Sequence, residues 1–272
     1  MTYSLRNKVA LITGASRSIG IGAATARQMA QAGADIFITY YRAYDIETTA
    51  LAGETNEINQ LLTDLRDMGV RAEGLDLDLT VPSAPQKLFD RVESVLGSVD
   101  ILVNNATHSE NDTIDSLTAD LIDKHYTMNL RGLMLLCQAF VKHRTAKETP
   151  TPTTQQQALQ LAGGGRIINL TSGQGAGPMP NELCYAATKG AVEAFTVSLS
   201  AAVAPRGITV NAVDPGATDT GWIPPELRTQ LDNQAPMGRV SLPEDAARLI
   251  SFLASDEAGW ITGQIIRSRG GL

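Results

Sequence analysis

Hydrophobic residues along the chain gather in short continuous runs, separated by longer segments in which they recur at helical spacing. Short apolar runs of this kind are typical of buried strands. We expect strands at residues 9–13, 35–40, 71–76, 101–104, 166–170, 209–213 and 264–267.

The segments between these runs predict helices. The clearest case lies between the second and third strands, where the hydrophobic positions are Ile58, Leu61, Leu62, Leu65 and Met68. Further helices are expected at residues 22–32, 82–96, 126–143, 185–204 and 243–254. Strict alternation of strand and helix predicts right-handed parallel βαβ units with helices on both faces of the sheet. We therefore expect an α/β protein with one doubly wound domain over residues 1–272 and about seven strands.

Two segments depart from this alternation. Residues 144–163 are rich in Thr, Pro and Gln, and Pro150 and Pro152 interrupt any continuous helix, so we expect a flexible surface insertion there. Residues 216–238 lie beyond the sixth strand, where α/β sheets place their ligands. We expect this segment to form a lid over a substrate, with Trp222 as either a pocket wall or a core anchor.

The composition excludes several classes of partner. The 272 residues include 22 Lys or Arg and 29 Asp or Glu, for a formal net charge of −7. This acidic balance argues against nucleic acids and anionic membranes as partners. With no apolar leader and no apolar run long enough to span a membrane, we expect a cytoplasmic location. Cys137 and Cys184 lack metal-ligand spacing, so we expect buried free thiols and no bound metal.

A glycine-rich loop from Thr13 to Gly22 follows the first strand and opens the first helix. Glycines in this position let the backbone approach a pyrophosphate, and the helix N-terminus attracts its negative charge. The pattern is weak alone, but at the start of an alternating chain it indicates a Rossmann-type dinucleotide site. The candidate coenzyme ligands of the loop are Gly14, Ser16, Arg17, Gly20 and Ile21.

The end of the second strand bears on which dinucleotide is bound. An acidic residue about 20 positions beyond the loop binds the ribose 2′-hydroxyl of NAD. No acid occupies that strand end, whereas Arg17 and Arg42 can both approach a 2′-phosphate. The sequence therefore favours NADP(H) as the cofactor. Asp45 and Glu47 follow shortly after and keep NAD(H) as the alternative.

Tyr185 and Lys189 lie one helical turn apart, and Ser172 precedes the tyrosine by thirteen positions. Because residues at i and i+4 share a helix face, we expect the lysine ammonium beside the phenol. The positive charge would lower the phenol pKa toward the range of a general acid or base, and Ser172 would hydrogen-bond the substrate oxygen. This spacing is common by chance on amphipathic helices, so its meaning depends on the other motifs.

The ordered motifs together resemble the short-chain dehydrogenase/reductase family, and within it the 3-oxoacyl-carrier-protein-reductase-like branch. The resemblance extends from Lys8 to Gly271. Besides the glycine loop, the motifs are Asp78-Leu79-Thr80, Asn104-Asn105-Ala106, Asn129, Ser172, Tyr185 with Lys189, Pro215-Gly216 and Ile261-Thr262-Gly263. The resemblance implies an oxidoreductase that transfers hydride between a nicotinamide coenzyme and a carbonyl or secondary alcohol carbon.

The resemblance also implies a role for each motif residue. Tyr185 would be the general acid in reduction and the base in oxidation, while Lys189 would lower its pKa and bind the nicotinamide ribose. Ser172 would polarise the carbonyl, and Asn129 would hold a water that relays protons to Lys189. The other implied coenzyme contacts are Asp78 and Leu79 at the adenine, Asn105 and Ala106 along the ribose, and Pro215, Gly216 and Thr220 at the nicotinamide amide.

The sequence departs from the family pattern at several points. Ser18 stands where the loop usually has its second glycine, and the helix register fits only if the loop is two residues longer, with Gly20 and Gly22 as its later glycines. Thr107 replaces the glycine that normally follows Asn-Asn-Ala. Only three residues separate Tyr185 from its lysine, rather than six, which argues against the enoyl-reductase branch.

Other functions and partners stay open on the sequence alone. The alternatives are a non-catalytic dinucleotide-sensing regulator and a dinucleotide-dependent epimerase or dehydratase. An acidic carrier protein would need a basic docking patch, so a small carbonyl or alcohol substrate is favoured. The resemblance suggests a homotetramer or homodimer built on the helices at 126–143 and 185–204. His108 and Gln174 are further candidates to face the substrate.

Overall fold

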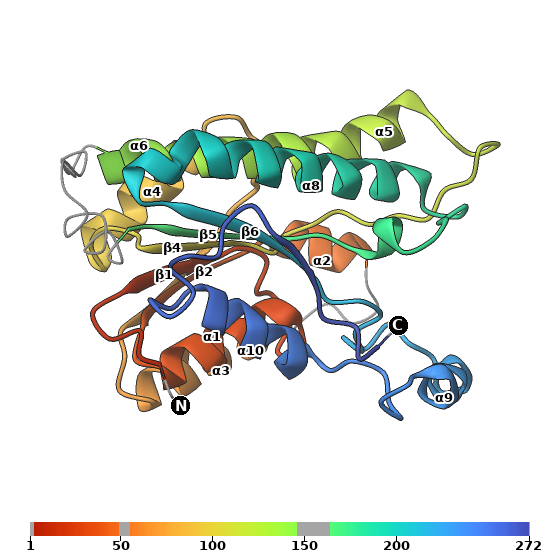
Figure 1. The fold of residues 1–272 in the computed structure, drawn as a ribbon, viewed down its shortest axis with the longest axis horizontal. Coiled ribbons are helices and arrows are strands. Elements are labelled where there is room, and N and C mark those ends of the chain that lie inside the picture. Colours follow the sequence, from red (N-terminus) through yellow and green to blue (C-terminus); the bar gives the residue numbers. More distant parts are fainter. Residues whose placement is uncertain (1–2, 49–54, 146–163, 272) are drawn as a thin grey trace.

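The computed structural model describes residues 3–48, 55–145 and 164–271. In these ranges the strands form one parallel seven-stranded sheet in the order β3-β2-β1-β4-β5-β6-β7 (Figure 1). The strands are β1 (Val9–Ile12), β2 (Asp35–Tyr40), β3 (Ala72–Asp76), β4 (Ile101–Asn104), β5 (Arg166–Leu170), β6 (Thr209–Asp214) and β7 (Ile265–Arg267). Each matches an expected strand to within one residue at either end, which confirms the predicted α/β class.

Helices cover both faces of the sheet. They are α1 (Ile21–Gln31), α2 (Arg42–Thr48), α3 (Thr55–Asp67), α4 (Ala84–Val95), α5 (Ala119–His125), the π-helical η1 (Tyr126–Gly132), α6 (Leu133–Thr145), the short η3 (Gly173–Gly175), α8 (Leu183–Val203), η4 (Ala204–Arg206), α9 (Pro225–Gln234) and α10 (Pro243–Leu253). Figure 1 shows α1, α3 and α10 on one face and α4, α6 and α8 on the other. The doubly wound arrangement is therefore confirmed.

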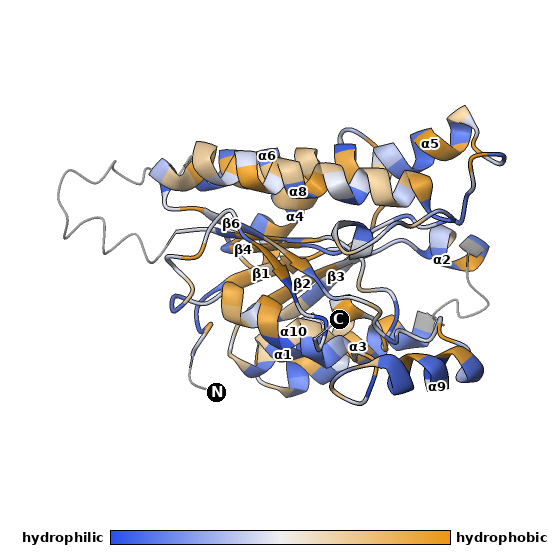
Figure 2. Ribbon diagram, turned by 45° about the vertical axis from the view of Figure 1, so that its right-hand side comes forward, coloured by the Kyte–Doolittle hydropathy of each residue, from blue (hydrophilic) through white to orange (hydrophobic). Residues whose placement is uncertain are grey.

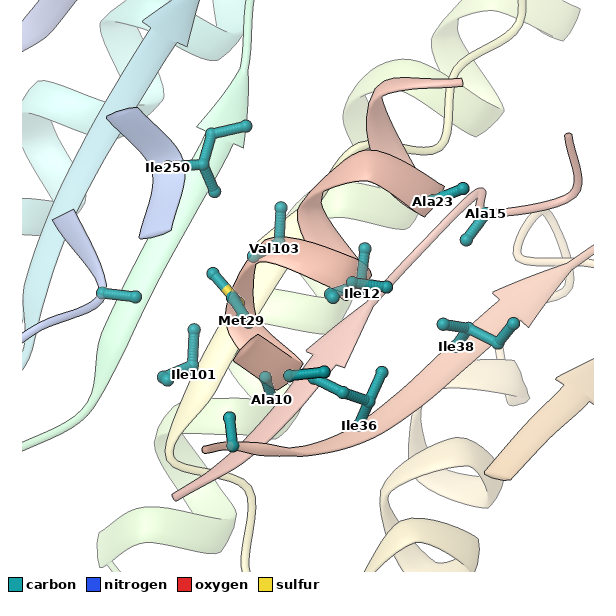
Figure 3. Close-up of a cluster of buried hydrophobic side chains, with 14 of the residues drawn as sticks. Ala10, Ile12, Ala15, Ala23, Met29, Ile36, Ile38, Ile101, Val103 and Ile250 are labelled. Atoms are coloured by element: carbon teal, nitrogen blue, oxygen red, sulfur yellow. The ribbon is translucent and has the colours of Figure 1, made fainter. Parts of the chain in front are cut away.

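Alternate residues of β1 contribute to two separate hydrophobic cores, because successive strand side chains point to opposite faces. On the α1 side, Met29 and Ile250 pack around Ala10 and Ile12 (Figure 3). The small side chain of Ala23 lets α1 lie close to the sheet. Figure 2 shows hydrophobic residues concentrated in the strands, whereas α9 is largely hydrophilic. This packing holds the N-terminus of α1 beside the end of β1.

The chain reverses direction within the sheet next to β1. It runs outward from β1 to β2 and β3, and then returns to β4 on the other side of β1. Such a reversal leaves a crevice outside the carboxyl ends of the strands, where doubly wound proteins bind their ligands. The loops that carry most of the motif residues follow these carboxyl ends.

Three helices were not expected from the sequence. α2 and α5 lie in segments that show no clear helical period, and α9 lies within the expected lid at residues 216–238. The helix expected at 126–143 is the continuation of α5, which begins at Ala119. Thr118 caps α5 by accepting a hydrogen bond of 3.2 Å from the backbone amide of Leu121.

Three expectations concern parts of the chain outside the sheet. Most of the expected insertion at 144–163 lies outside the described residues. Cys137 and Cys184 are buried free thiols, as expected. Among the helices in the described ranges, none combines the length and the hydrophobicity that crossing a membrane requires.

Candidate active site

Separate elements bring the predicted catalytic residues together beyond the sheet. Ser172 follows β5, Asn129 lies in η1, and Tyr185 and Lys189 lie one turn apart on α8. α8 packs against both η1 and η3, so the three segments meet. A π-helical turn such as η1 is frequent at functional sites because it presents a side chain out of the α-helical register.

The phenol of Tyr185 is partly buried and has two hydroxyl partners, Ser172 and Thr107. Burial disfavours the charged phenolate and raises the pKa of Tyr185 to about 12, although the hydrogen bonds from both hydroxyls lower it. The sequence predicted a pKa lowered by Lys189. This prediction is wrong for the structure, because desolvation outweighs the favourable contacts. Tyr185 is therefore in its acid form at neutral pH.

Lys189 is buried below the tyrosine. Its ammonium lies 5.4 Å from the centroid of the Tyr185 ring, and Nζ donates a hydrogen bond of 2.9 Å to the carbonyl oxygen of Leu170. Burial lowers the pKa of Lys189 from 10.5 to about 8. The side chain is thus mainly protonated at pH 7, and places a positive charge under the phenol.

Replacing Lys189 by methionine is expected to stabilise the fold. The lowered pKa of Lys189 corresponds to about 3 kcal/mol of lost stability at neutral pH. Losing the bond to the Leu170 carbonyl opposes this gain by about 1 kcal/mol, which leaves a net gain of about 2 kcal/mol. From pH 8 to 10.5 the unfolded lysine holds its proton more tightly, so native stability rises with pH and the advantage of methionine shrinks.

Chemical denaturation of both proteins at neutral pH and near pH 10 measures this effect. Lys124→Met is the matched control, because Lys124 is an exposed lysine on α5. A Lys189 variant that is less stable than the wild type at neutral pH would contradict the expectation.

Both ends of the Asn129 amide are held by hydrogen bonds. Its Oδ1 accepts from the His108 amide at 2.7 Å and from the Thr107 hydroxyl at 3.0 Å. Its Nδ2 donates to the His108 carbonyl at 2.9 Å and to the Thr188 hydroxyl at 3.1 Å. Thr188 in turn donates to the backbone carbonyl of Tyr185 at 2.9 Å. Asn129 therefore connects the loop after β4 with α8, through two threonines that no sequence motif had singled out as hydrogen-bond partners.

The glycine loop is packed too tightly for side chains at two positions. Gly14 has a φ of +70°, and a Cβ there would lie 2.6 Å from the Cα of Ala106. A Cβ on Gly22 would lie 2.8 Å from both Asn105 Nδ2 and the Gly14 carbonyl oxygen. At Gly20, the N-cap of α1, the nearest atom would be 3.2 Å away. Gly22 is thus the later glycine that packs closely against the strand loops. This supports a glycine loop two residues longer than the usual family pattern, with Gly22 as its last glycine.

Asn105 joins this loop to the loop after β4. Its Nδ2 donates to the carbonyls of Thr13 and Gly14 at 2.9 Å each, and the Thr13 hydroxyl accepts from the amides of Asn105 and Ala106 at 3.1 Å each. The first turn of α1, from Ile21, carries no acidic residue, and among the described residues no side chain caps it. Its N–H groups are therefore available to a phosphate, so the site fits a dinucleotide.

Asp78 and Leu79 lie in the turn after β3. Asp78 Oδ1 accepts hydrogen bonds from the Thr80 amide at 2.8 Å and from the Thr80 hydroxyl at 2.6 Å. The Leu79 side chain is buried. The turn is thus held in one conformation beyond the strand end, where the resemblance places the adenine.

The two arginines expected at a 2′-phosphate lie in different surroundings. Arg17 donates to the Thr220 carbonyl at 3.3 Å and faces the carboxylate of Asp45, which is also hydrogen-bonded to Ser16. Burial raises the pKa of Asp45, and these two neighbours lower it. Arg42 is exposed at the start of α2. An acidic side chain from α2 therefore lies on the glycine loop.

A buried ion pair holds the loop after β6. Asp214 accepts a hydrogen bond of 3.0 Å from the Gly216 amide, and its other oxygen lies 2.5 Å from Arg269 Nη2. Pro215 and Gly216, the residues expected at the nicotinamide, are thereby tied to the C-terminal segment. The two partners are 55 residues apart, so local sequence patterns could not reveal the pair.

Three further candidates have structural partners. Trp222 is 54% exposed and its indole donates to a backbone carbonyl at 2.8 Å, so it is not a core anchor. The His108 ring packs edge-on against His125, with centroids 4.6 Å apart. Gln174 donates to Glu193 at 2.7 Å. The two polar residues are thus engaged in contacts within the protein.

Comparison with known proteins adds independent information. Residues 14–272 match the family model described as enoyl-(acyl carrier protein) reductase. The uncharacterized oxidoreductase YjdA of Bacillus subtilis (strain 168) is 45% identical over 271 residues, which are 100% of this chain and 98% of that protein. Cyclohexanol dehydrogenase of Rhodococcus sp. (strain TK6) is 34% identical, and the match covers 98% of this chain and 97% of that protein.

A solved structure is similar over the same length. The promiscuous reductase LugOII, which catalyses keto-reduction at C1 during lugdunomycin biosynthesis, has a TM-score of 0.81 and 33% identity, with 98% of each chain covered. Sequence, fold and site geometry therefore agree over nearly the whole chain. The protein belongs to the short-chain dehydrogenase/reductase family, whose oxidoreductases use nicotinamide dinucleotide coenzymes.

Proposed function

We propose that the protein transfers hydride between a nicotinamide dinucleotide and a small carbonyl compound or the corresponding secondary alcohol. The observation that carries this proposal is the arrangement of Tyr185 between Ser172 and Lys189, beside a glycine loop that fits a pyrophosphate. When bound, the coenzyme supplies or accepts the hydride. The residues of the chain then bind, orient and exchange a proton with the substrate oxygen.

Each residue has a distinct part in this exchange. Ser172 would donate a hydrogen bond to the substrate oxygen and hold it close to the phenol. Tyr185, protonated at neutral pH, would pass its proton to that oxygen during reduction. The charged Lys189 would stabilise the phenolate that remains. Oxidation needs the phenolate form of Tyr185, so its rate is expected to rise with pH.

The substrate class follows from the spacing of the site and from the relatives. Three residues lie between Tyr185 and Lys189, which supports carbonyl rather than enoyl reduction, although the matching family model is named for an enoyl reductase. The names of cyclohexanol dehydrogenase and LugOII, a ketoreductase, point the same way. The net charge of −7 disfavours docking of an acidic carrier protein.

A panel of cyclic and linear ketones and secondary alcohols, assayed with NADPH, NADH and their oxidised forms, tests this function. Absorbance of the reduced nicotinamide should change stoichiometrically with product. Coenzyme binding with no redox change for any substrate, or product formed with no net change in absorbance, would favour a sensing protein or an epimerase instead.

For the coenzyme we propose NADP(H), with Arg42 and Arg17 binding the 2′-phosphate. Replacing Arg42 by alanine is expected to lower kcat/KM with NADPH about tenfold and to leave kcat/KM with NADH almost unchanged. The contact between Asp45 and Ser16 favours the alternative, in which Asp45 binds a ribose hydroxyl of NAD. The variant Asp45→Ala separates these two assignments. Its kcat/KM with NADPH should rise if Arg17 binds the 2′-phosphate, whereas its kcat/KM with NADH should fall if Asp45 binds the ribose.

We also propose that the protein assembles as a homotetramer or homodimer. Tyr126 in η1, Met134 in α6 and Val197 in α8 are large hydrophobic side chains exposed on the surface of these helices. Burying such residues against a second copy removes apolar surface from water. Light scattering measures the particle mass, and a monomer at micromolar concentration would refute this assembly.

A further inference from the structure

Asp112 is a buried acidic residue that belongs to none of the sequence motifs. It lies in the loop between β4 and α5 and is 2% exposed. Its Oδ1 accepts a hydrogen bond of 2.5 Å from the Leu183 amide, and its Oδ2 accepts one of 2.9 Å from the Cys184 amide. Burying a carboxylate is costly unless hydrogen bonds compensate its charge, and both oxygens of Asp112 are compensated by the backbone of α8.

This contact caps the helix that carries Tyr185 and Lys189. Leu183 is the first residue of α8, and the amides of a first turn have no acceptor within their own helix. Glu182 occupies the N-cap position, but in the described part of the chain its side chain makes no capping hydrogen bond, and the first turn contains no acidic residue. Asp112 therefore supplies the acceptor oxygens and the negative charge that a helix N-terminus favours.

The loop that contains Asp112 is itself attached to α8 at a second point. The Asp112 amide donates to the Asn181 carbonyl at 2.9 Å, just before the helix begins. Nearer to β4, the amide and the carbonyl of His108 are both bonded to Asn129, and Asn129 donates to the Thr188 hydroxyl on α8. The predicted general acid lies between these two attachments. The loop after β4 therefore fixes the start of α8 on both sides of the phenol-bearing residue.

The carboxylate of Asp112 keeps its charge in this setting. Burial raises its pKa, but the hydrogen bonds from Cys184 and Leu183 outweigh burial and hold the pKa below its ordinary value. The cap is thus present throughout the neutral pH range.

We propose that Asp112 is a positioning residue for Tyr185: its carboxylate holds the first turn of α8 so that the phenol points at the substrate oxygen. This inference rests on the proposed function. Tyr185 follows Cys184 directly, so the backbone that Asp112 holds sets the direction of the phenol. Asp112 acts only through this backbone and takes no part in the proton transfer.

Two variants of Asp112 test this role. Asp112→Ala removes both acceptors, whereas Asp112→Asn keeps the shape and one acceptor oxygen but turns an NH₂ group toward the other amide. We expect kcat to fall about a hundredfold in D112A and about tenfold in D112N, because a small misplacement of a reacting group is enough to slow the chemical step. The dissociation constants of NADPH and NADH, measured by calorimetric titration, should stay within about threefold of the wild type.

Thr118→Ala is the matched control. It also removes a side-chain acceptor from the start of a helix, but that helix is α5. Its kcat should stay within about twofold of the wild type, so a general loss of helix stability is separated from a loss of positioning.

Amide hydrogen exchange gives a readout that needs neither coenzyme nor turnover. The Leu183 and Cys184 amides should exchange about tenfold faster in D112A than in the wild type or T118A, while the later turns of α8 keep their protection. Thermal unfolding of each variant checks that the fold is retained, and D112N serves if D112A does not fold.

The outcomes are distinguishable. Wild-type kcat in D112A and D112N would overturn the positioning role, and so would a loss of coenzyme binding that matches the loss of kcat. Wild-type exchange at Leu183 and Cys184 in D112A would overturn the cap itself. Turnover that survives in Tyr185→Phe would instead overturn the proposed function, whereas the exchange measurement would still support or overturn the cap.

Discussion

Replacing Tyr185 by phenylalanine is expected to lower kcat by about a thousandfold, since general acid catalysis by one side chain contributes roughly 10²–10⁴ in rate. Only the hydroxyl is removed, and the aromatic ring that lies above Lys189 remains. Ser172 and Thr107 lose their common partner, but the glycine loop is untouched. The dissociation constant of the coenzyme should therefore stay within about threefold of the wild type.

Steady-state rates and a coenzyme titration on the same preparation measure the two parts of this expectation. Tyr3→Phe is the matched control, because Tyr3 loses the same hydroxyl while its ring packs against Phe252 far along the chain from the site. Turnover that survives in Tyr185→Phe would remove this residue from the mechanism. Loss of coenzyme binding together with turnover would show that the hydroxyl is needed for assembly of the site.

Introducing a single methyl group at Gly22 is the second change with a large expected effect. The Cβ of Gly22→Ala would lie 2.8 Å from both Asn105 Nδ2 and the Gly14 carbonyl oxygen, well inside contact distance. These atoms already share a hydrogen bond of 2.9 Å, which the methyl group would force apart. Overpacking of this kind costs about 1–3 kcal/mol, so coenzyme affinity should fall roughly ten- to hundredfold.

Gly177→Ala is the matched control, because it adds the same methyl group at an exposed glycine where no atom would lie within 4 Å of it. Calorimetric titration with the coenzyme and thermal unfolding should show a small effect for this variant and a large one for Gly22→Ala. Wild-type coenzyme affinity in Gly22→Ala would mean that the loop can accept a methyl group at this position, against the expectation.

Most of the fold could be predicted because the relevant signals are local. The five inner strands of the sheet contain short apolar runs that are buried between two helical layers, so their limits are visible without knowledge of their neighbours. The edge strands β3 and β7 are only partly buried. Short helices are different. α9 has no buried residue, and α5 buries Leu121 and His125 alone among its seven residues, so neither shows a strong hydrophobic period. Their existence depends on the surfaces around them.

The ionisation of the site could not be predicted from spacing. The i, i+4 relation correctly places Lys189 near Tyr185, but the pKa of each group depends on how much of the protein covers it. Burial raises one pKa and lowers the other, so both groups are displaced toward their neutral forms. This effect belongs to the packed structure and to no single motif.

The amino-acid sequence by itself determined the parallel α/β architecture, the glycine loop and the identity of the motif residues, because each depends on neighbours within one element. Only the tertiary structure decided which side chains meet between elements. Asn129 binds Thr188, Asp45 lies on the glycine loop, and Asp214 pairs with Arg269 because strands distant in sequence end at the same edge of the sheet. Contacts of this kind arise from folding, and a linear pattern contains no signal for them.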